Sequence, residues 1–326
     1  MKVGIVGAGG MGNVHALKYS LMPDVEIHVF DISKHKLEAF ARRHEIKAHS
    51  KLESLLSTID ALDVCTPTDT HAGIAIPALE RGISTLVEKP IAGSMEDCHG
   101  MINAAKKGGA TLMPAQVVRF FPEHRKAHEL IASGSIGRVA SVRLRRGGRA
   151  PQGQDGWFLD PGRSGGVLLD LAVHEFDWLC WTLGPVVEVM SRSVTLGPRI
   201  EGADFVGDYA LTTLTHASGC ISHVESTWMD PSGFRTTIEA AGSEGVIEFD
   251  SRQNPSLRVH LQDSGSRPEN LMDPLDDPYY LQLRSFVDAV TGKAGYPVSA
   301  DEGAAAVRIA LAAIESARSC QPVKIG

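Results

Sequence analysis

The segment Leu169–Leu183 combines residue types that can move a proton. Asp170, His174 and Asp177 are spaced i, i+4 and i+7, so on a helix they would share one face. Histidine titrates near neutral pH and suits acid–base work, and carboxylates can orient what it acts on. Apolar residues cover most of the remaining surface. Taken alone, the same stripe is also typical of the solvated face of an amphipathic helix.

A second candidate is the glycine run that follows the first apolar strand. Gly7 to Gly12 fits the pattern G-x-G-x-x-G, lies after a strand and opens a helix, as a dinucleotide fingerprint requires. We expect one glycine to permit the tight turn, the next to admit the pyrophosphate, and the last to let helix and strand pack closely. The predicted cofactor-binding residues of this run are Gly7, Gly9, Gly10, Met11 and Gly12. The alternative is a turn that binds no ligand.

Asp31 ends the second predicted strand, 19 positions after Gly12. Its carboxylate would accept hydrogen bonds from the adenosine ribose hydroxyls and repel a 2′-phosphate. The sequence therefore favours NAD as cofactor, while the nearby Lys34 keeps NADP open.

Strands and helices alternate over the first 120 residues, which predicts a parallel, doubly wound sheet. Ser33 is placed to cap the second helix, and Gly82 to end the third. We expect strands at 3–6, 25–30, 62–66, 85–87 and 111–115, and helices at 13–21, 34–44, 71–81 and 95–107.

The pattern changes after residue 120, where short alternating strands predict a largely antiparallel sheet with one covered face. The glycine-rich stretch 146–166 reads as a long loop in which Trp157 and Arg163 could close over cofactor and substrate, or simply lie at the surface. Hairpin turns are expected at 217–219 and 243–245. Further expected elements are helices at 123–133, 280–290 and 300–319, strands at 139–145, 186–196, 206–216, 219–228, 235–242, 245–250 and 257–262, and a loop at 262–278.

Several segments together resemble the Gfo/Idh/MocA family of oxidoreductases. They are CTPTDTH (65–71), RFFP (119–122), EKPIA (88–92), PVSADEG (297–303) and the stretch 164–184 that contains Asp170 and His174. The resemblance implies an α/β protein: a Rossmann NAD-binding domain over 1–120, and an α+β domain with a largely antiparallel open sheet over 121–326. Helix 300–319 could pack back on the first domain. The chain departs from the family pattern at Thr68, at 165–167 and at Ala172.

The resemblance also implies roles for individual residues. Lys89 matches the family's active-site lysine, Asp170 its substrate-binding aspartate and His174 its catalytic histidine. Thr66, Pro67, His71 and Glu88 would line the nicotinamide side of the cofactor, together with Lys89. We expect Trp157, Lys89, Asp170 and His174 to contact the substrate.

These types suit the oxidation of a secondary alcohol, in which a hydride goes to the nicotinamide and a proton to a base. His174 would be that base, Lys89 would stabilise the developing alkoxide, and Asp170 would hold a neighbouring hydroxyl. The alternative without a catalytic role is that Lys89 is a surface lysine at the end of a strand, or a cation that pairs with Glu88. Pro90 restricts Lys89 to extended backbone, and whether their peptide bond is cis stays open.

Composition excludes other classes of protein. The net charge of −7 argues against a general nucleic-acid binder, whose surface is usually basic. Five scattered cysteines and the lack of a long apolar run favour a cytoplasmic protein with no membrane partner. The other histidines, His15 and His28 among them, do not cluster in sequence at metal-ligand spacing, so no metal is predicted.

The predicted activity is NAD(P)-dependent hydride transfer at a sugar, inositol or related polyol. Two rivals are a glycoside-cleaving enzyme that uses NAD transiently and a non-catalytic NAD sensor; a sensor need not keep Lys89, Asp170 and His174. By resemblance, the flat face of the second sheet would join copies of the chain into a homodimer or homotetramer.

Overall fold

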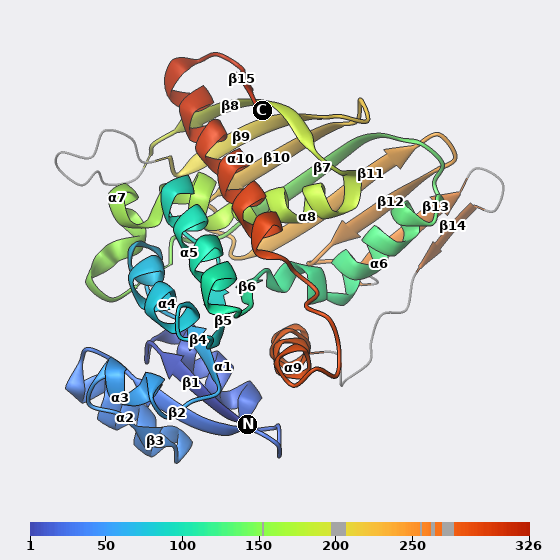
Figure 1. Ribbon diagram of the computed structural model, residues 1–326. Coiled ribbons are helices and arrows are strands. Elements are labelled where there is room, and N and C mark those ends of the chain that lie inside the picture. The colour runs from blue at the N-terminus through green and yellow to red at the C-terminus, as the bar shows by residue number, and fades with distance from the viewer. Residues whose placement is uncertain (152, 197–206, 255, 262–264, 269–276) are drawn as a thin grey trace. The chain divides into compact units, whose positions relative to one another are not determined.

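The computed structural model describes residues 1–151, 153–196, 207–254, 256–261, 265–268 and 277–326. They form two compact units (Figure 1). The first comprises 1–120 and 275–304, and the second 121–274 and 305–326. Residues 300–304, the beginning of helix α10 (Ala300–Ser319), group with the first unit, and the rest of that helix groups with the second.

The first unit is built on a six-stranded parallel sheet in the order β3-β2-β1-β4-β5-β6. The order reverses between β1 and β4, and ligands of such sheets bind at this point, beyond the carboxyl ends of the strands. The predicted Rossmann topology is confirmed. The strands are β1 Lys2–Val6, β2 Glu26–Phe30, β3 Lys47–Ala48, β4 Ala61–Val64, β5 Ser84–Glu88 and β6 Leu112–Ala115.

Helices flank this sheet, and the N-cap residues of two of them show where those helices begin. Ser33 caps α2 by accepting the N–H of Lys36 at 3.4 Å, as expected. The first helix begins at Gly10 rather than Asn13, because Gly9 is its N-cap and the last glycines of the motif are already helical. The helices are α1 Gly10–Tyr19, α2 Lys34–His44, α3 Leu52–Leu56, α4 His71–Leu79, α5 Met95–Gly108 and α9 Pro278–Val290, with 3₁₀ turns η1 Thr68–Thr70 and η2 Val117–Phe120.

The second unit contains a nine-stranded sheet in the order β14-β13-β12-β11-β7-β10-β9-β8-β15. Among the described strands of this second sheet, only the pair β7–β10 is parallel, so the prediction of a largely antiparallel sheet is confirmed. Both predicted hairpin turns join antiparallel neighbours. The strands are β7 Val139–Gly147, β8 Val186–Val194, β9 Tyr209–His216, β10 Ile221–Thr227, β11 Arg235–Gly242, β12 Gly245–Asp250, β13 Leu257–Leu261, β14 Gly265–Pro268 and β15 Val323–Lys324.

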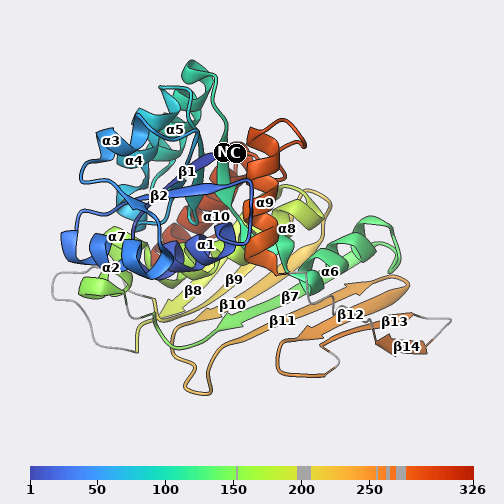
Figure 2. The same cartoon turned by 90° about the horizontal axis from the view of Figure 1, so that it is seen from below.

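Helices α6 (Pro122–Ala132) and α8 (Val173–Leu183) lie over one face of this sheet (Figure 2). The strands alternate accordingly: Leu144 and Ile238 are buried beneath the helices, while Arg143 and Glu239 point to the other face. The indole N–H of Trp178 donates to the carbonyl of His124 at 3.0 Å and ties α8 to α6.

Two predicted loops contain regular structure. The stretch 146–166 holds the end of β7, the 3₁₀ turn η3 (Gln154–Leu159) and the short helix α7 (Pro161–Ser164). The stretch 262–278 contains β14 and the start of α9, and its residues 262–264 and 269–276 lie outside the described residues, as does the predicted strand start at 206. Along the described chain, no helix has both the length and the apolar character needed to cross a membrane. The cytoplasmic location stays a prediction.

Candidate functional site

The turn between β1 and α1 has the backbone geometry expected of a dinucleotide site. Gly7 adopts φ +107°, and a Cβ there would lie 2.5 Å from the carbonyl oxygen of Cys65. A Cβ on Gly12 would overlap the carbonyl oxygen of Gly7. Both positions therefore require glycine, one for the turn and one for the close approach of helix to strand.

Gly9 and Gly10 are not under the same steric constraint. A Cβ on either would meet no described atom within 4 Å, so the space beside them is open. No described side chain caps α1, whose first N–H groups face this space with the positive end of the helix dipole. Backbone N–H groups and an open cradle fit a pyrophosphate, so these residues could hold NAD.

Asp31 lies beside the same turn. Its carboxylate accepts the N–H of Ala8 at 2.8 Å and that of Ser33 at 2.7 Å, one at each oxygen. Each carboxylate oxygen can accept a second hydrogen bond. Asp31 can therefore support the turn and still accept from a ribose hydroxyl.

Lys89, Glu88, Thr66 and Pro67 follow the carboxyl ends of β5 and β4, the edge at which a parallel sheet binds ligands. The Lys89–Pro90 peptide bond is cis. Glu88 is buried and accepts the backbone N–H of Lys89 at 3.1 Å, whereas Lys89 is half-buried. The structure thus brings together the site residues predicted in the first unit.

His71 joins two of these turns. Its Nδ1 lies 3.0 Å from the carbonyl oxygen of Pro90, and its Nε2 lies 2.9 Å from that of Thr66. Burial lowers the pKa of His71, although the carbonyl of Thr66 and the charge of Glu88 oppose this. A neutral imidazole has one N–H, so His71 donates a hydrogen bond to one of these carbonyl oxygens and lies against the other, between the Thr66 and Pro90 turns.

A buried polar cluster that the sequence analysis missed lies behind these turns. His15 Nδ1 is 2.8 Å from Asp63 Oδ2, and Cys65 Sγ is 3.3 Å from each of these two side chains. His15 is a buried, hydrogen-bonded core residue, and the three side chains bring possible metal ligands within 4.8 Å of one another. However, two ligands of one tetrahedral zinc ion are about 3.3 Å apart. The 2.8 Å contact is instead a direct hydrogen bond.

The second unit places Asp170 and His174 differently from the single helix expected. Val167–Leu171 forms a π-helical turn, and α8 begins only at Val173. Asp170 lies in the π-helical turn and His174 lies in the first turn of α8. The two residues therefore do not share one face of a regular α-helix. π-turns occur frequently at functional sites. Asp170 is 3 % exposed and Asp177 is 1 % exposed, whereas His174 is half-buried.

The residue after His174 anchors α8 to the sheet. Glu175 is buried and lies 2.5 Å from Nε of Arg146 on β7, which is also buried. This ion pair fixes the first turn of α8. Lys89 belongs to the first unit, and the Asp170–His174 segment belongs to the second.

Trp157 lies in η3 and stacks on Phe158, with ring centroids 3.9 Å apart. Its ring is half-buried, as is Arg163 in α7. The assignment of Trp157 to the substrate stays a prediction.

Two further buried polar residues lie at the edge of the first sheet, and only the second, in the RFFP segment, carried a sequence signal. Gln116 follows β6, is 1 % exposed, and has no hydrogen-bond partner for either amide atom among the described residues. A buried unpartnered amide is costly, which is why such groups mark ligand or water positions. Arg119 is buried and lies 2.7 Å from Glu302, so the RFFP and PVSADEG segments meet in an ion pair.

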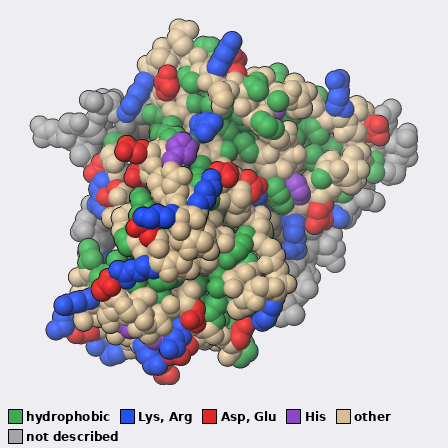
Figure 3. Space-filling view, viewed as in Figure 1, with side chains coloured by type: hydrophobic (Ala, Val, Ile, Leu, Met, Phe, Trp, Pro, Cys, Tyr) green, Lys and Arg blue, Asp and Glu red, His purple; other side chains and the backbone are tan. Residues whose placement is uncertain are grey.

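One face of the protein mixes both signs of charge. On the face shown in Figure 3, acidic and basic side chains are interspersed among polar and apolar ones.

Two family models cover most of the chain. Residues 1–116 match the model described as "Oxidoreductase family, NAD-binding Rossmann fold", and residues 124–248 match the GFO/IDH/MocA C-terminal domain. The chain is 27% identical to myo-inositol 2-dehydrogenase of Thermotoga maritima, with 100% of this chain and 98% of that protein covered.

Solved structures resemble the whole chain as well. Levoglucosan dehydrogenase in complex with NADH superposes with a TM-score of 0.91 at 25% identity, covering 100% of this chain and 99% of the other. GenD2 from gentamicin A biosynthesis, in complex with NAD, gives a TM-score of 0.88 at 27% identity, covering 100% and 96%.

Proposed function

Because the chain belongs to the Gfo/Idh/MocA family of oxidoreductases, we propose that it oxidises or reduces a secondary alcohol of a sugar, inositol or related polyol with NAD. The observation that carries the proposal is the glycine turn, whose open cradle at Gly9 lies beside the carboxylate of Asp31. Relatives named for inositol and levoglucosan dehydrogenation support the substrate class.

The bound nicotinamide supplies the hydride acceptor or donor. His174 takes the hydroxyl proton, and gives it back in the reverse direction. The ammonium of Lys89 stabilises negative charge on the same oxygen, and Asp170 accepts a hydrogen bond from a neighbouring hydroxyl. Thr66, Pro67 and Glu88 border the nicotinamide end, with His71 lying between the Thr66 and Pro90 turns, and Trp157 contacts the substrate.

The test is a panel of inositols, monosaccharides and aryl glycosides incubated with NAD, monitored at the absorbance band of NADH. Accumulation of NADH with a polyol supports the dehydrogenase. Release of the aryl group without net NADH favours a glycoside-cleaving enzyme, and cofactor binding with no turnover favours a sensor.

Cofactor preference provides a separate prediction. Asp31→Asn keeps an acceptor for a backbone N–H but removes the charge that opposes a 2′-phosphate. We expect the ratio of NADP to NAD dissociation constants to fall by about tenfold to a hundredfold, because hydrogen bonds to charged groups are the strong ones. Fluorescence titration with each cofactor measures the ratio, and an unchanged ratio would contradict the role of Asp31.

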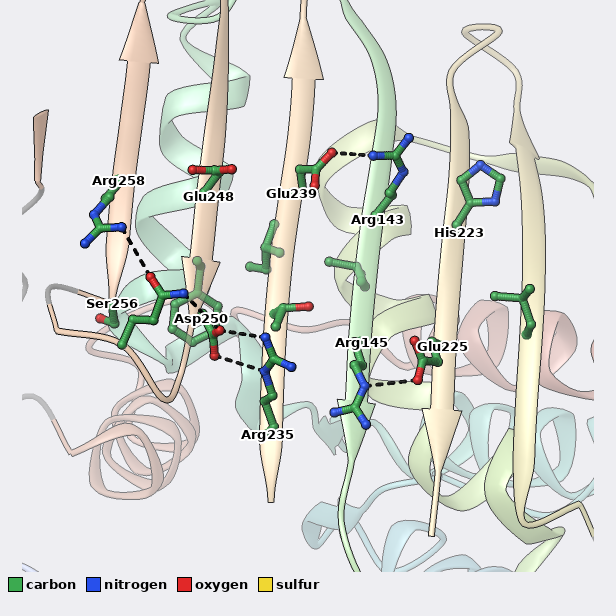
Figure 4. A pocket seen from close by; sticks show the side chains of 16 residues that line it. Arg143, Arg145, His223, Glu225, Arg235, Glu239, Glu248, Asp250, Ser256 and Arg258 are labelled. Carbon is green, nitrogen blue, oxygen red and sulfur yellow. Dashed lines mark hydrogen bonds and ion pairs between the residues drawn. The ribbon is translucent and has the colours of Figure 1, made fainter. Parts of the chain in front are cut away.

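We also propose that the uncovered face of the nine-stranded sheet joins copies of the chain. Charged side chains form cross-strand pairs there, such as Arg145 with Glu225 at 3.0 Å and Arg235 with Asp250 at 2.7 Å (Figure 4). The charged pairs line a pocket on this face, which Figure 4 shows from close by. Leu211 lines the same pocket and is 47% exposed.

Light scattering should give a mass that is a multiple of the chain mass, and Leu211→Arg should shift it toward the monomer. Ile32→Arg is the matched control, since Ile32 is 95% exposed in the first unit. A monomeric wild-type protein would overturn the interface.

A further inference from the structure

Helix α1 does more than present its N-terminus to a cofactor. His15, one and a half turns into the helix, is fully buried and reaches both β4 and β5. Its Nδ1 lies 2.8 Å from Asp63 Oδ2, and its Nε2 lies 3.3 Å from Glu88 Oε1. Because α1 also contains the last glycines of the turn, one rigid element contacts the phosphate end of the site and the Glu88 side chain.

The other carboxylate oxygen of Glu88 contacts the next residue in the chain. Oε2 accepts the backbone N–H of Lys89 at 3.1 Å. A continuous chain of contacts therefore runs from Asp63 through His15 and Glu88 to the backbone of Lys89. All three side chains of this chain are buried, with relative side-chain exposures of 0 %, 0 % and 9 %.

Charge explains why a histidine stands here. Burial lowers the pKa of His15, but the carboxylate of Asp63 and the contact with Cys65 outweigh it and hold the pKa well above its usual value. Burial raises the pKa of Glu88, and the His15 contact outweighs this and lowers it. One imidazolium thus balances buried negative charge at the ends of two adjacent strands.

We propose that His15 is a positioning residue: it fixes the carboxylate of Glu88 against the Lys89 N–H and so sets where the lysine leaves the sheet. That Lys89 then acts on substrate rests on the proposed function. The positioning itself is a property of the chain without cofactor. A purely structural His15 would stabilise the core without any specific effect at Lys89.

Two substitutions separate the two contacts of the ring. The amide nitrogen of asparagine occupies the place of Nδ1, and that of glutamine the place of Nε2. His15→Asn therefore keeps the hydrogen bond toward Asp63 and loses the 3.3 Å ion-pair contact with Glu88, while His15→Gln does the reverse. His28→Gln is the matched control, because His28 is buried on β2 of the same sheet and contacts Glu26 instead.

The first measurement is hydrogen exchange of the Lys89 amide in the protein without cofactor. We expect about tenfold faster exchange in His15→Asn, less change in His15→Gln, and wild-type exchange in His28→Gln. Equal exchange in His15→Asn and wild type, or equal acceleration in both His15 variants, would overturn the proposal. If His15→Asn does not fold, Glu88→Met tests the same link, because methionine removes the oxygen that accepts the Lys89 N–H. Unchanged Lys89 exchange there overturns the proposal as well.

The second measurement is steady-state kinetics on the substrate identified by the panel. His15→Asn should lower kcat by about tenfold while the dissociation constant of NADH changes less than about twofold. The double variant His15→Asn/Glu88→Met should be no slower than the slower single variant, since both break one chain of contacts. Additive losses would overturn the proposal. A wild-type protein with no turnover would refute the proposed function and leave the exchange result to decide the positioning.

Discussion

Replacing His174 by alanine is expected to lower kcat by at least a hundredfold with every substrate that the wild-type enzyme oxidises. The variant keeps the glycine turn and Asp31, which lie in the other unit and which we propose hold the cofactor. It loses the base that takes the hydroxyl proton, and a positioned acid–base group contributes about a hundredfold to ten-thousandfold. Stopped-flow and steady-state assays at the NADH band measure the loss.

Binding separates this loss from misfolding. The dissociation constant of NADH should stay within about twofold, because in the proposed scheme the histidine acts on the reacting oxygen and not on the phosphates. His260→Gln serves as the control, since His260 is a partly exposed histidine of the same unit paired with Glu248 at 2.9 Å. Loss of NADH affinity in His174→Ala, or a rate near that of wild type, would contradict the assignment.

The cofactor turn was the most predictable part of the site. A sequence encodes it locally: glycine is the only residue that tolerates the positive φ of Gly7 and the close approach at Gly12, and both constraints arise between residues near in sequence or on adjacent strands. Strand order followed for the same reason, because alternating strands and helices leave few parallel topologies.

The π-helical turn before His174 was not predictable from the spacing of polar residues. The spacing predicts an α-helix, with 3.6 residues per turn, that already includes Asp170. Instead, Gly165 and Gly166 adopt φ +74° and +68°, and the chain enters the helix through a π-helical turn. A local change of helical period leaves a weak sequence signal, because the apolar residues around it are buried in either geometry.

The buried cluster around His15 escaped prediction for another reason. His15, Asp63 and Glu88 are far apart in sequence. The apolar residues around each of them predict a helix or a strand, and nothing in those patterns indicates a contact among the three polar side chains. Only the register of β4 beside β1 and β5 brings their side chains beneath one helix. Long-range polar contacts of this kind depend on strand order and on side-chain direction together.

These contacts also relate the two roles of the first unit. The helix whose N-terminus faces the open cradle at Gly9 carries the imidazole that contacts Glu88. In the proposed scheme one element therefore positions both the cofactor and the lysine. Precise orientation is the main contribution a protein makes when the cofactor supplies the hydride chemistry.

Replacing Lys89 by methionine should therefore separate orientation from charge. Methionine keeps the length of the side chain and the backbone N–H that Glu88 accepts, but removes the ammonium. We expect kcat to fall by about a hundredfold to a thousandfold, the range for losing a group that stabilises an oxyanion. The dissociation constant of NADH should change less than about threefold.

The pH dependence gives this prediction a sign. Removing a positive charge near a histidine base makes the base easier to protonate, so the acidic limb of kcat/KM should move to higher pH in Lys89→Met. Lys89→Arg keeps the charge and should leave that limb in place, although its larger head group lowers the rate. An acidic limb that stays fixed in Lys89→Met would mean that the ammonium and the imidazole of His174 do not act on the same oxygen. The proton-transfer scheme would then have to be abandoned even if both single variants were slow.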